Sequence, residues 1–244
     1  MKSNEETCVC NVFATFQPLS PIRQLAKRAG VWYNIPKEKM NMAKRPLYIP
    51  GGYNPGNFKM NKKMLKKLRP ELFELKHKWF ALDDIPQHIK SQLQKGDTET
   101  AVVVSVDPLL VACYSGDMDA VVLLCLPTMY GVRRGYQVGT RLLTVNGYDG
   151  MPKGGSSQDV YEGPDSSGRF RAYGPIIADL YTADCARLEG IKALIPEEHW
   201  DYVMDLGFEY MEINPGMARN GLANRYSASM PINLIHFHPK VVID

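Results

Sequence analysis

The sequence lacks most of the short motifs that reveal an activity. Its five cysteines form no Cys-x-x-Cys pair, which excludes a recognisable zinc knuckle or thioredoxin-type redox pair. It has no P-loop and no Gly-x-Ser-x-Gly elbow. The glycines near residues 163–168 do not form a dinucleotide fingerprint. We therefore expect a binding protein slightly more than an enzyme, although catalytic groups can also assemble from distant residues.

Long apolar runs are also absent. No stretch approaches the roughly 20 residues of a membrane-spanning helix, and the acidic start at Glu5 and Glu6 leads into no apolar signal core. Cys113 and Cys125 lie in apolar runs, as is typical of buried, reduced thiols. We expect a reduced, cytoplasmic protein that does not associate with membranes.

The composition is that of an ordinary globular protein. Of 244 residues, 45% are hydrophobic and 23% are charged, values that argue against a disordered or collagen-like chain. We expect residues 1–43 to form an N-terminal extension, partly flexible, and residues 44–244 to form a single domain. The sequence does not identify an oligomeric state.

Charge is distributed unevenly along the chain. The first hundred residues contain 18 Lys and Arg against 9 Asp and Glu, whereas the remaining residues contain 11 against 17. The halves therefore carry +9 and −6, which together give the net charge of +3. Two interpretations follow: oppositely charged surfaces that face each other, or a basic arm that meets an anionic partner.

The central region predicts a sheet. β-Branched and aliphatic runs occupy residues 100–106, 109–114, 120–126 and 136–148, separated by short polar breaks, and a further run covers residues 232–238. Apolar periodicity predicts helices over residues 59–69, 71–82, 86–94, 175–194 and 196–212. The pattern favours an α+β fold: a central antiparallel meander packed by the C-terminal helices, with a basic helical segment before the sheet.

The basic helical segment is the first candidate site. Its cationic stripe consists of Lys62, Lys63, Lys66, Lys67 and Arg69. Such a stripe attracts acidic protein surfaces or phosphates. No nucleic-acid-binding module accompanies it, so we expect a nucleic acid to be the less favoured partner. A simple solvated helix face is the alternative interpretation.

The last long helix carries the opposite charge. Its acidic residues are Glu197, Glu198, Asp201, Asp205, Glu209 and Glu212. Asp201, Asp205 and Glu209 repel one another at a spacing of four residues unless a cation lies nearby. We expect Asp201, Asp205 and Glu209 to interact with the basic segment or with a basic partner; the alternative is a face that only increases solubility.

Two further groups of residues are candidate ligand sites. Arg169 and Arg171 lie in a glycine-rich stretch of residues 147–175, and Arg219 and Arg225 lie in a turn-rich tail, where they are suited to an anionic ligand. His236 and His238 are spaced to share one face of a strand, which is the arrangement of metal ligands in β-proteins. Two ligands alone do not hold a metal, so we expect no cofactor, with a metal-dependent enzyme at His236 and His238 as the alternative.

The sequence therefore predicts an α+β protein that binds an unidentified protein or small anionic ligand. Its predicted contacts are the basic segment near residue 62–69 and the acidic helix near residue 201–209. A nucleic-acid binder that uses the basic segment is a further alternative. The identity of the ligand is not predicted.

Overall fold

The computed structural model describes residues 55–73, 84–149, 156–222 and 234–236. The predicted extension over residues 1–43 and most of the predicted helix over 71–82 lie outside these residues. So do Arg225 and His238, together with the side chain of His236.

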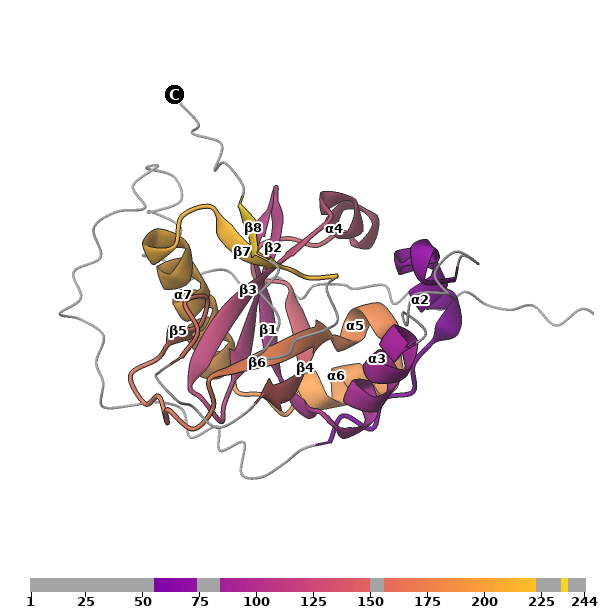
Figure 1. Ribbon diagram of the computed structural model, residues 1–244, viewed down its shortest axis with the longest axis horizontal. Coiled ribbons are helices and arrows are strands. Elements are labelled where there is room, and N and C mark those ends of the chain that lie inside the picture. The colour runs from indigo at the N-terminus through magenta and orange to yellow at the C-terminus, as the bar shows by residue number, and fades with distance from the viewer. Residues whose placement is uncertain (1–54, 74–83, 150–155, 223–233, 237–244) are drawn as a thin grey trace, which may run out of the picture. The chain divides into compact units, whose positions relative to one another are not determined.

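One mixed sheet organises the described part of the chain (Figure 1). Its strand order is β6-β4-β1-β2-β3-β7-β8, and β5 pairs with β3. The strands are β1 (Asp97–Val106), β2 (Leu109–Ser115), β3 (Ala120–Leu126), β4 (Arg141–Asp149), β5 (Tyr161–Glu162), β6 (Ala172–Ile177), β7 (Met217–Asn220) and β8 (Leu234–His236). Strands β1, β2 and β3 are almost wholly buried, because their valine- and leucine-rich sequences are covered on both faces.

Helices surround this sheet. They are α2 (Lys62–Leu68), η2 (Pro70–Phe73), α3 (Asp84–Lys95), α4 (Thr128–Arg134), α5 (Ala178–Tyr181), α6 (Cys185–Lys192) and α7 (Glu197–Ile213). Helix α7 packs across β1, β2 and β3, whereas α3, α5 and α6 pack against β4 and α2 packs against α5. No helix in the described ranges is long and apolar enough to cross a membrane.

The predicted α+β class is confirmed, but the sheet is not purely antiparallel. Strand β7 runs parallel to β3, with Leu124 opposite Arg219. The chain reaches β7 from β6 through α5, α6 and α7. A connection of this length can return a strand in the parallel direction, which a tight hairpin cannot do.

Glycine permits the close packing of α7 on the sheet. A Cβ atom placed on Gly207 would lie 2.7 Å from the Cβ of Ala112 and 2.8 Å from a methyl group of Val104. Val102 is paired with Ala112, so it shares that face. The odd-numbered residues of β1 up to Val103 therefore point to the opposite face of the sheet.

Two local predictions are wrong. The predicted helix over residues 175–194 is divided into the end of β6, α5 and α6. Thr182 separates the two helices: its hydroxyl donates to the carbonyl of Lys59 at 3.0 Å and accepts from the amide of Asp184. Helix α4 was not predicted, and the strand expected from residue 136 begins only at Arg141. Gly135, with φ of 65°, ends α4 in a left-handed conformation.

Candidate binding surfaces and buried polar clusters

Helix α2 displays its lysines because two leucines fix its inward face. Asn61 caps the helix, since its side chain accepts from the amides of Lys63 at 2.9 Å and Met64 at 3.2 Å. Leu65 and Leu68, three residues apart, are buried. The four lysines of the helix, Lys62, Lys63, Lys66 and Lys67, are exposed.

Helix α4 adds its own cations to the same surface. The hydroxyl of Tyr130 on α4 donates to the carbonyl of Leu68 on α2 at 2.7 Å. Burial raises the pKa of Tyr130, while the nearby charges of Arg69 and Arg133 oppose that rise. Both guanidinium groups therefore lie near the junction, although about sixty residues separate them in sequence.

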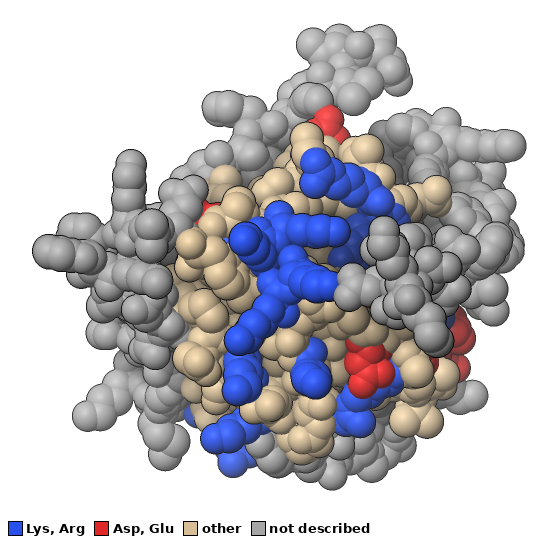
Figure 2. Space-filling view, turned by 90° about the vertical axis from the view of Figure 1, so that its right-hand side faces the viewer, with Lys and Arg blue, Asp and Glu red and all other residues tan. Residues whose placement is uncertain are grey.

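We call the resulting patch the basic surface. It comprises Lys62, Lys63, Lys66, Lys67, Arg69, Arg133 and Arg134. Figure 2 shows lysine and arginine side chains gathered in one band on the side of the domain where Figure 1 places α2 and α4. Only a few acidic side chains are visible on that side (Figure 2).

Arg69 has a different position from the lysines. Its side chain is mostly buried, forms an ion pair with Glu71 and donates to the carbonyl of Leu222. Glu71 is therefore the acidic neighbour that reduces the positive charge at this edge of the basic surface. Arg69 joins α2 to the chain after β7, whereas the four lysines project into solvent.

Exposed apolar side chains accompany these cations. On α4, Val132 is 76% exposed and Met129 is 57% exposed. Phe73 on η2, directly after α2, is 40% exposed. Single exposed hydrophobic residues are common, but their combination with a charged surface is typical of a contact site.

The acidic charge lies along the outer side of α7. Val203, Gly207 and Tyr210 are buried on its inner side. Glu198, Asp201 and Glu212 are exposed, while Asp205 and Glu209 are half-buried. We call these five carboxylates the acidic surface.

Polar contacts also hold α7 in the fold. Tyr161 donates to Glu209 at 2.8 Å. Glu197, at the start of the helix, forms a two-point ion pair with Arg141 of β4. The guanidinium of Arg141 also lies over the ring of Trp200 at 5.2 Å.

The basic and acidic surfaces do not face each other within the domain. Figure 1 places α2 and α7 on opposite sides, with the sheet between them. One of the two interpretations of the uneven charge, that its poles meet in the same molecule, is therefore excluded for α2 and α7.

The glycine-rich stretch is held in place by the turn between β2 and β3. Ser167 donates to the carbonyl of Asp117 at 2.6 Å, and the amide of Asp165 donates to Asp119 at 2.7 Å. A Cβ atom on Gly163 would lie 2.5 Å from a carboxylate oxygen of Asp119, so only glycine fits there. Arg169 and Arg171 are both exposed on this stretch.

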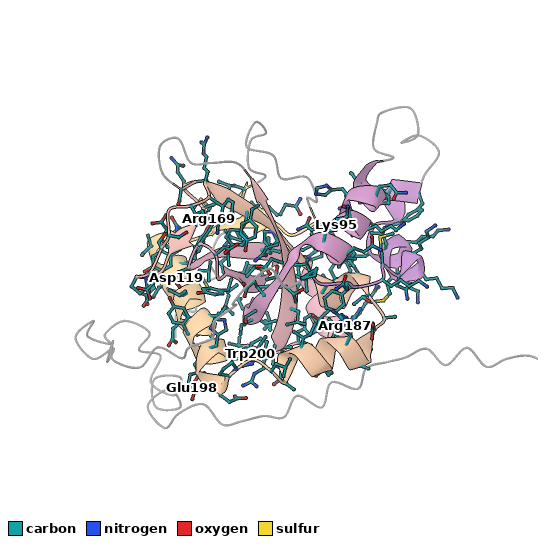
Figure 3. All side chains as sticks on the ribbon, turned by 90° about the horizontal axis from the view of Figure 1, so that it is seen from below. Lys95, Asp119, Arg169, Arg187, Glu198 and Trp200 are labelled. Carbon is teal, nitrogen blue, oxygen red and sulfur yellow. The ribbon has the colours of Figure 1, made fainter. Side chains whose placement is uncertain are left out.

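The predicted arginine ligands that the structure describes differ in burial: Arg169 and Arg171 are exposed, whereas Arg219 is buried. Arg169 lies 4.0 Å from Asp117 and over the ring of Phe170, on the same side of the domain as Asp119 (Figure 3). Arg219 is only 5% exposed, forms an ion pair with Asp159 and donates to the carbonyl of Tyr173. Its charge is used inside the fold.

The structure describes only one residue of the predicted histidine pair. His236 lies on β8, opposite Met217 of β7. Within the described residues, no three His, Cys, Asp or Glu side chains are arranged to hold a metal ion.

Sequence reasoning missed a carboxyl pair on the sheet face opposite α7. Glu99 and Asp97 project from β1 on that face, and Glu99 is 0% exposed. One oxygen of Glu99 accepts from the amide of Gly116 at 3.3 Å, and the other has no hydrogen-bond partner among the described residues. Burial first, and then the charge of Asp97, raise the pKa of Glu99 well above its usual value. Glu99 is therefore neutral over a wider pH range than an exposed glutamate.

A tyrosine and a serine complete this polar cluster. Ser115 donates to the hydroxyl of Tyr148 at 3.1 Å, which donates to Asp97 at 3.3 Å. The ring of Tyr148 stacks on Phe170, with 4.6 Å between the ring centres. The available sequence signal was the pair of acidic residues at positions 97 and 99, two apart at the start of an otherwise apolar strand.

A second polar cluster lies beside α7. Asp119 accepts from Tyr114 at 2.9 Å and from Tyr202 at 2.6 Å. The ring of His199 contacts that of Tyr114 edge to face at 5.0 Å. Burial lowers the pKa of His199 to about 4, against a smaller opposite effect of Asp119. His199 is therefore neutral at physiological pH and serves as a packing residue in this cluster.

Cysteine chemistry is limited in the described structure. Cys113 and Cys125 are free thiols, and burial raises the pKa of both. A raised pKa disfavours the thiolate, which is the nucleophilic form. Cys185 is disulfide-bonded, in contrast to the uniformly reduced set that we expected.

Comparison with models of protein families, with curated proteins and with solved structures finds no match.

Proposed function

We propose that this protein is a protein-interaction module whose basic surface binds an acidic surface on a partner protein. The observation that supports the proposal is the junction of α2 and α4. Two helices far apart in sequence are joined by Tyr130 and Leu68, and their exposed cations point outward from one patch. The inward face of α2 is formed by buried leucines and not by these cations.

The exposed apolar side chains support a protein partner. Met129 and Val132 lie on the helix that also carries Arg133 and Arg134. Protein interfaces combine an apolar centre with a charged rim, whereas DNA-binding surfaces are more polar and more strongly charged. Proteins that bind unpaired bases stack them on aromatic side chains. The described part of the basic surface has two such side chains nearby, Phe73 and Tyr130, and the hydroxyl of Tyr130 already donates to Leu68.

A cytoplasmic location is part of the proposal. The free thiols of Cys113 and Cys125 support it. The disulfide at Cys185 is the observation against it. Mass spectrometry of the protein from cell extracts that are denatured and alkylated without reductant tests this part: modification of all five cysteines supports the cytoplasm, and an unmodified Cys185 contradicts it.

Binding to a defined acidic polymer tests the function. We expect the full chain to bind fluorescent poly-L-glutamate more tightly than random-sequence duplex DNA of equal charge. Lys66→Glu/Arg133→Glu changes one residue on each helix and should weaken polyglutamate binding by about tenfold or more. Lys90→Glu/Lys95→Glu alters two exposed cations of α3 that do not belong to the basic surface. This matched control changes the net charge equally and should bind like the wild type.

Two outcomes would overturn the proposal. Equal losses in the two double variants would show that only net charge matters. Tighter binding to the DNA, with a steep dependence on salt, would make the nucleic-acid alternative the better description. Circular dichroism of each variant checks that the fold is retained.

A further inference from the structure

The basic and acidic surfaces of one molecule point in different directions. Helix α2 packs against α5, and α7 packs against β1, β2 and β3. They lie on opposite sides of the sheet in Figure 1. A second copy of the chain, by contrast, can bring its α7 to the basic surface of the first.

The two surfaces are also complementary in their apolar content. The basic surface includes Val132 and Met129 on α4. The acidic surface ends at Ile213, which is 60% exposed and follows Glu212, and it begins close to Leu194, which is 79% exposed. Figure 3 places Glu198 at the end of α7 that lies near Trp200, on the rim of the domain. Each surface therefore combines charge of one sign with exposed aliphatic side chains.

We propose that the basic surface of one copy binds the acidic surface of α7 in a second copy. This inference rests on the proposed function and names its partner. Because different patches meet, the contact is head-to-tail, and the pair still has one unoccupied patch of each sign, the acidic surface of the first copy and the basic surface of the second. Association therefore extends beyond a dimer unless the rotation between neighbouring copies closes a ring.

The form of the contact predicts its behaviour in solution. Charges at the edge of an interface mainly affect the association rate and the salt dependence. The screening length falls from about 30 Å in 0.01 M salt to about 3 Å in 1 M salt. We therefore expect self-association at low salt, growing with protein concentration, and its loss at high salt.

Sedimentation velocity of the full chain, over a range of protein and salt concentrations, measures this association. Lys66→Glu/Arg133→Glu weakens the basic surface and leaves the acidic surface intact, whereas Glu198→Lys/Glu212→Lys weakens the acidic surface and leaves the basic surface intact. Each variant alone should lose self-association by about tenfold or more in affinity. Lys90→Glu/Lys95→Glu is the matched control and should associate like the wild type.

Sedimentation of a mixture of the two double variants is the decisive experiment. In the mixture, the intact acidic surface of the first variant meets the intact basic surface of the second, so complexes should reappear. A wild type that stays monomeric at low salt, or a mixture that does not associate, would overturn the second copy as partner. If polyglutamate still binds the basic surface in that case, the proposed function survives and only the identity of the partner is wrong.

Discussion

Charge is treated differently on the sheet face opposite α7 and on the basic surface. On that sheet face, Arg219 is paired with Asp159, and burial raises the pKa of Glu99. On the basic surface, the lysines of α2 stay in contact with solvent. A buried charge must be compensated within the fold, because its desolvation is costly. An exposed charge stays hydrated, so it needs no such compensation and can contact a partner.

The largest expected effect comes from breaking the buried ion pair. Asp159→Asn leaves the Arg219 guanidinium in the interior without its counter-charge, and we expect a loss of about 3–5 kcal/mol in the free energy of unfolding. Chemical denaturation measures it. The double variant Asp159→Leu/Arg219→Met removes both charges and should be more stable than the single variant. A loss below about 1 kcal/mol, the range of an exposed pair, would contradict the burial of this pair.

Replacing Glu99 with glutamine should have the next largest effect on the free energy of unfolding, and it should increase stability rather than reduce it. Its raised pKa means that the native state binds the proton more tightly than the unfolded chain. Stability is therefore fully present below the ordinary glutamate pKa of about 4.3 and is lost as pH rises, by about 1.4 kcal/mol for each pH unit until Glu99 ionises in the native state. Glu99→Gln cannot ionise, so its advantage over the wild type should grow with pH across this window.

Denaturation curves collected at several pH values test this prediction. Glu162→Gln removes a carboxylate from exposed strand β5 and serves as the control for a simple change of surface charge. A constant difference between Glu99→Gln and the wild type from acid to neutral pH would show that Glu99 does not keep its proton in the native state.

The exposed pair of Arg141 and Glu197 marks the intermediate case. The two-point hydrogen bond with Arg141 lowers the pKa of Glu197, so its contribution is present above the ordinary glutamate pKa and is lost as pH falls. Both side chains are substantially exposed. Arg141→Gln should therefore cost only about 0.2–1 kcal/mol. Thermal unfolding at low and high salt checks this value, and a cost that salt does not reduce would point instead to the stacking of Arg141 on Trp200.

The smallest effect on stability should come from the basic surface. Lys66→Glu/Arg133→Glu should change the free energy of unfolding by less than about 0.5 kcal/mol, since exposed side chains away from caps and the core contribute little. The same variant should nevertheless lose the predicted binding. A large loss of stability would instead show that these cations support the fold, and the contrast between interior and surface charge would fail.

Much of the secondary structure could be predicted from local patterns. The apolar spacing of residues 200–211 predicted α7, because an i, i+3, i+4 pattern is readable along one helix. The valine-rich runs predicted β1 and β3 for a similar reason. Helix α4 escaped prediction because its seven residues carry little periodicity, and its boundaries depend on Pro127 and Gly135.

Only part of the basic surface could be predicted from the sequence. The lysines of α2 were identified because they are neighbours in sequence. Arg133 and Arg134 were not, since their proximity to α2 depends on how α4 packs. Arg219 was predicted to meet a ligand, but nothing in its neighbouring sequence indicates that β7 places it beside Asp159. Asp97 and Glu99 are visible in the sequence as two acidic residues at the start of an apolar strand, but only the tertiary structure shows that Glu99 is buried.

The sequence by itself determined the α+β class, most of the strands, the long acidic helix and the uneven distribution of charge, because each depends on residues close together in the chain. Only the tertiary structure decided which charges are buried, which are exposed and which lie side by side. Burial and proximity depend on contacts between distant segments, such as Tyr130 with Leu68 and Arg219 with Asp159, and local pattern carries no information about those contacts.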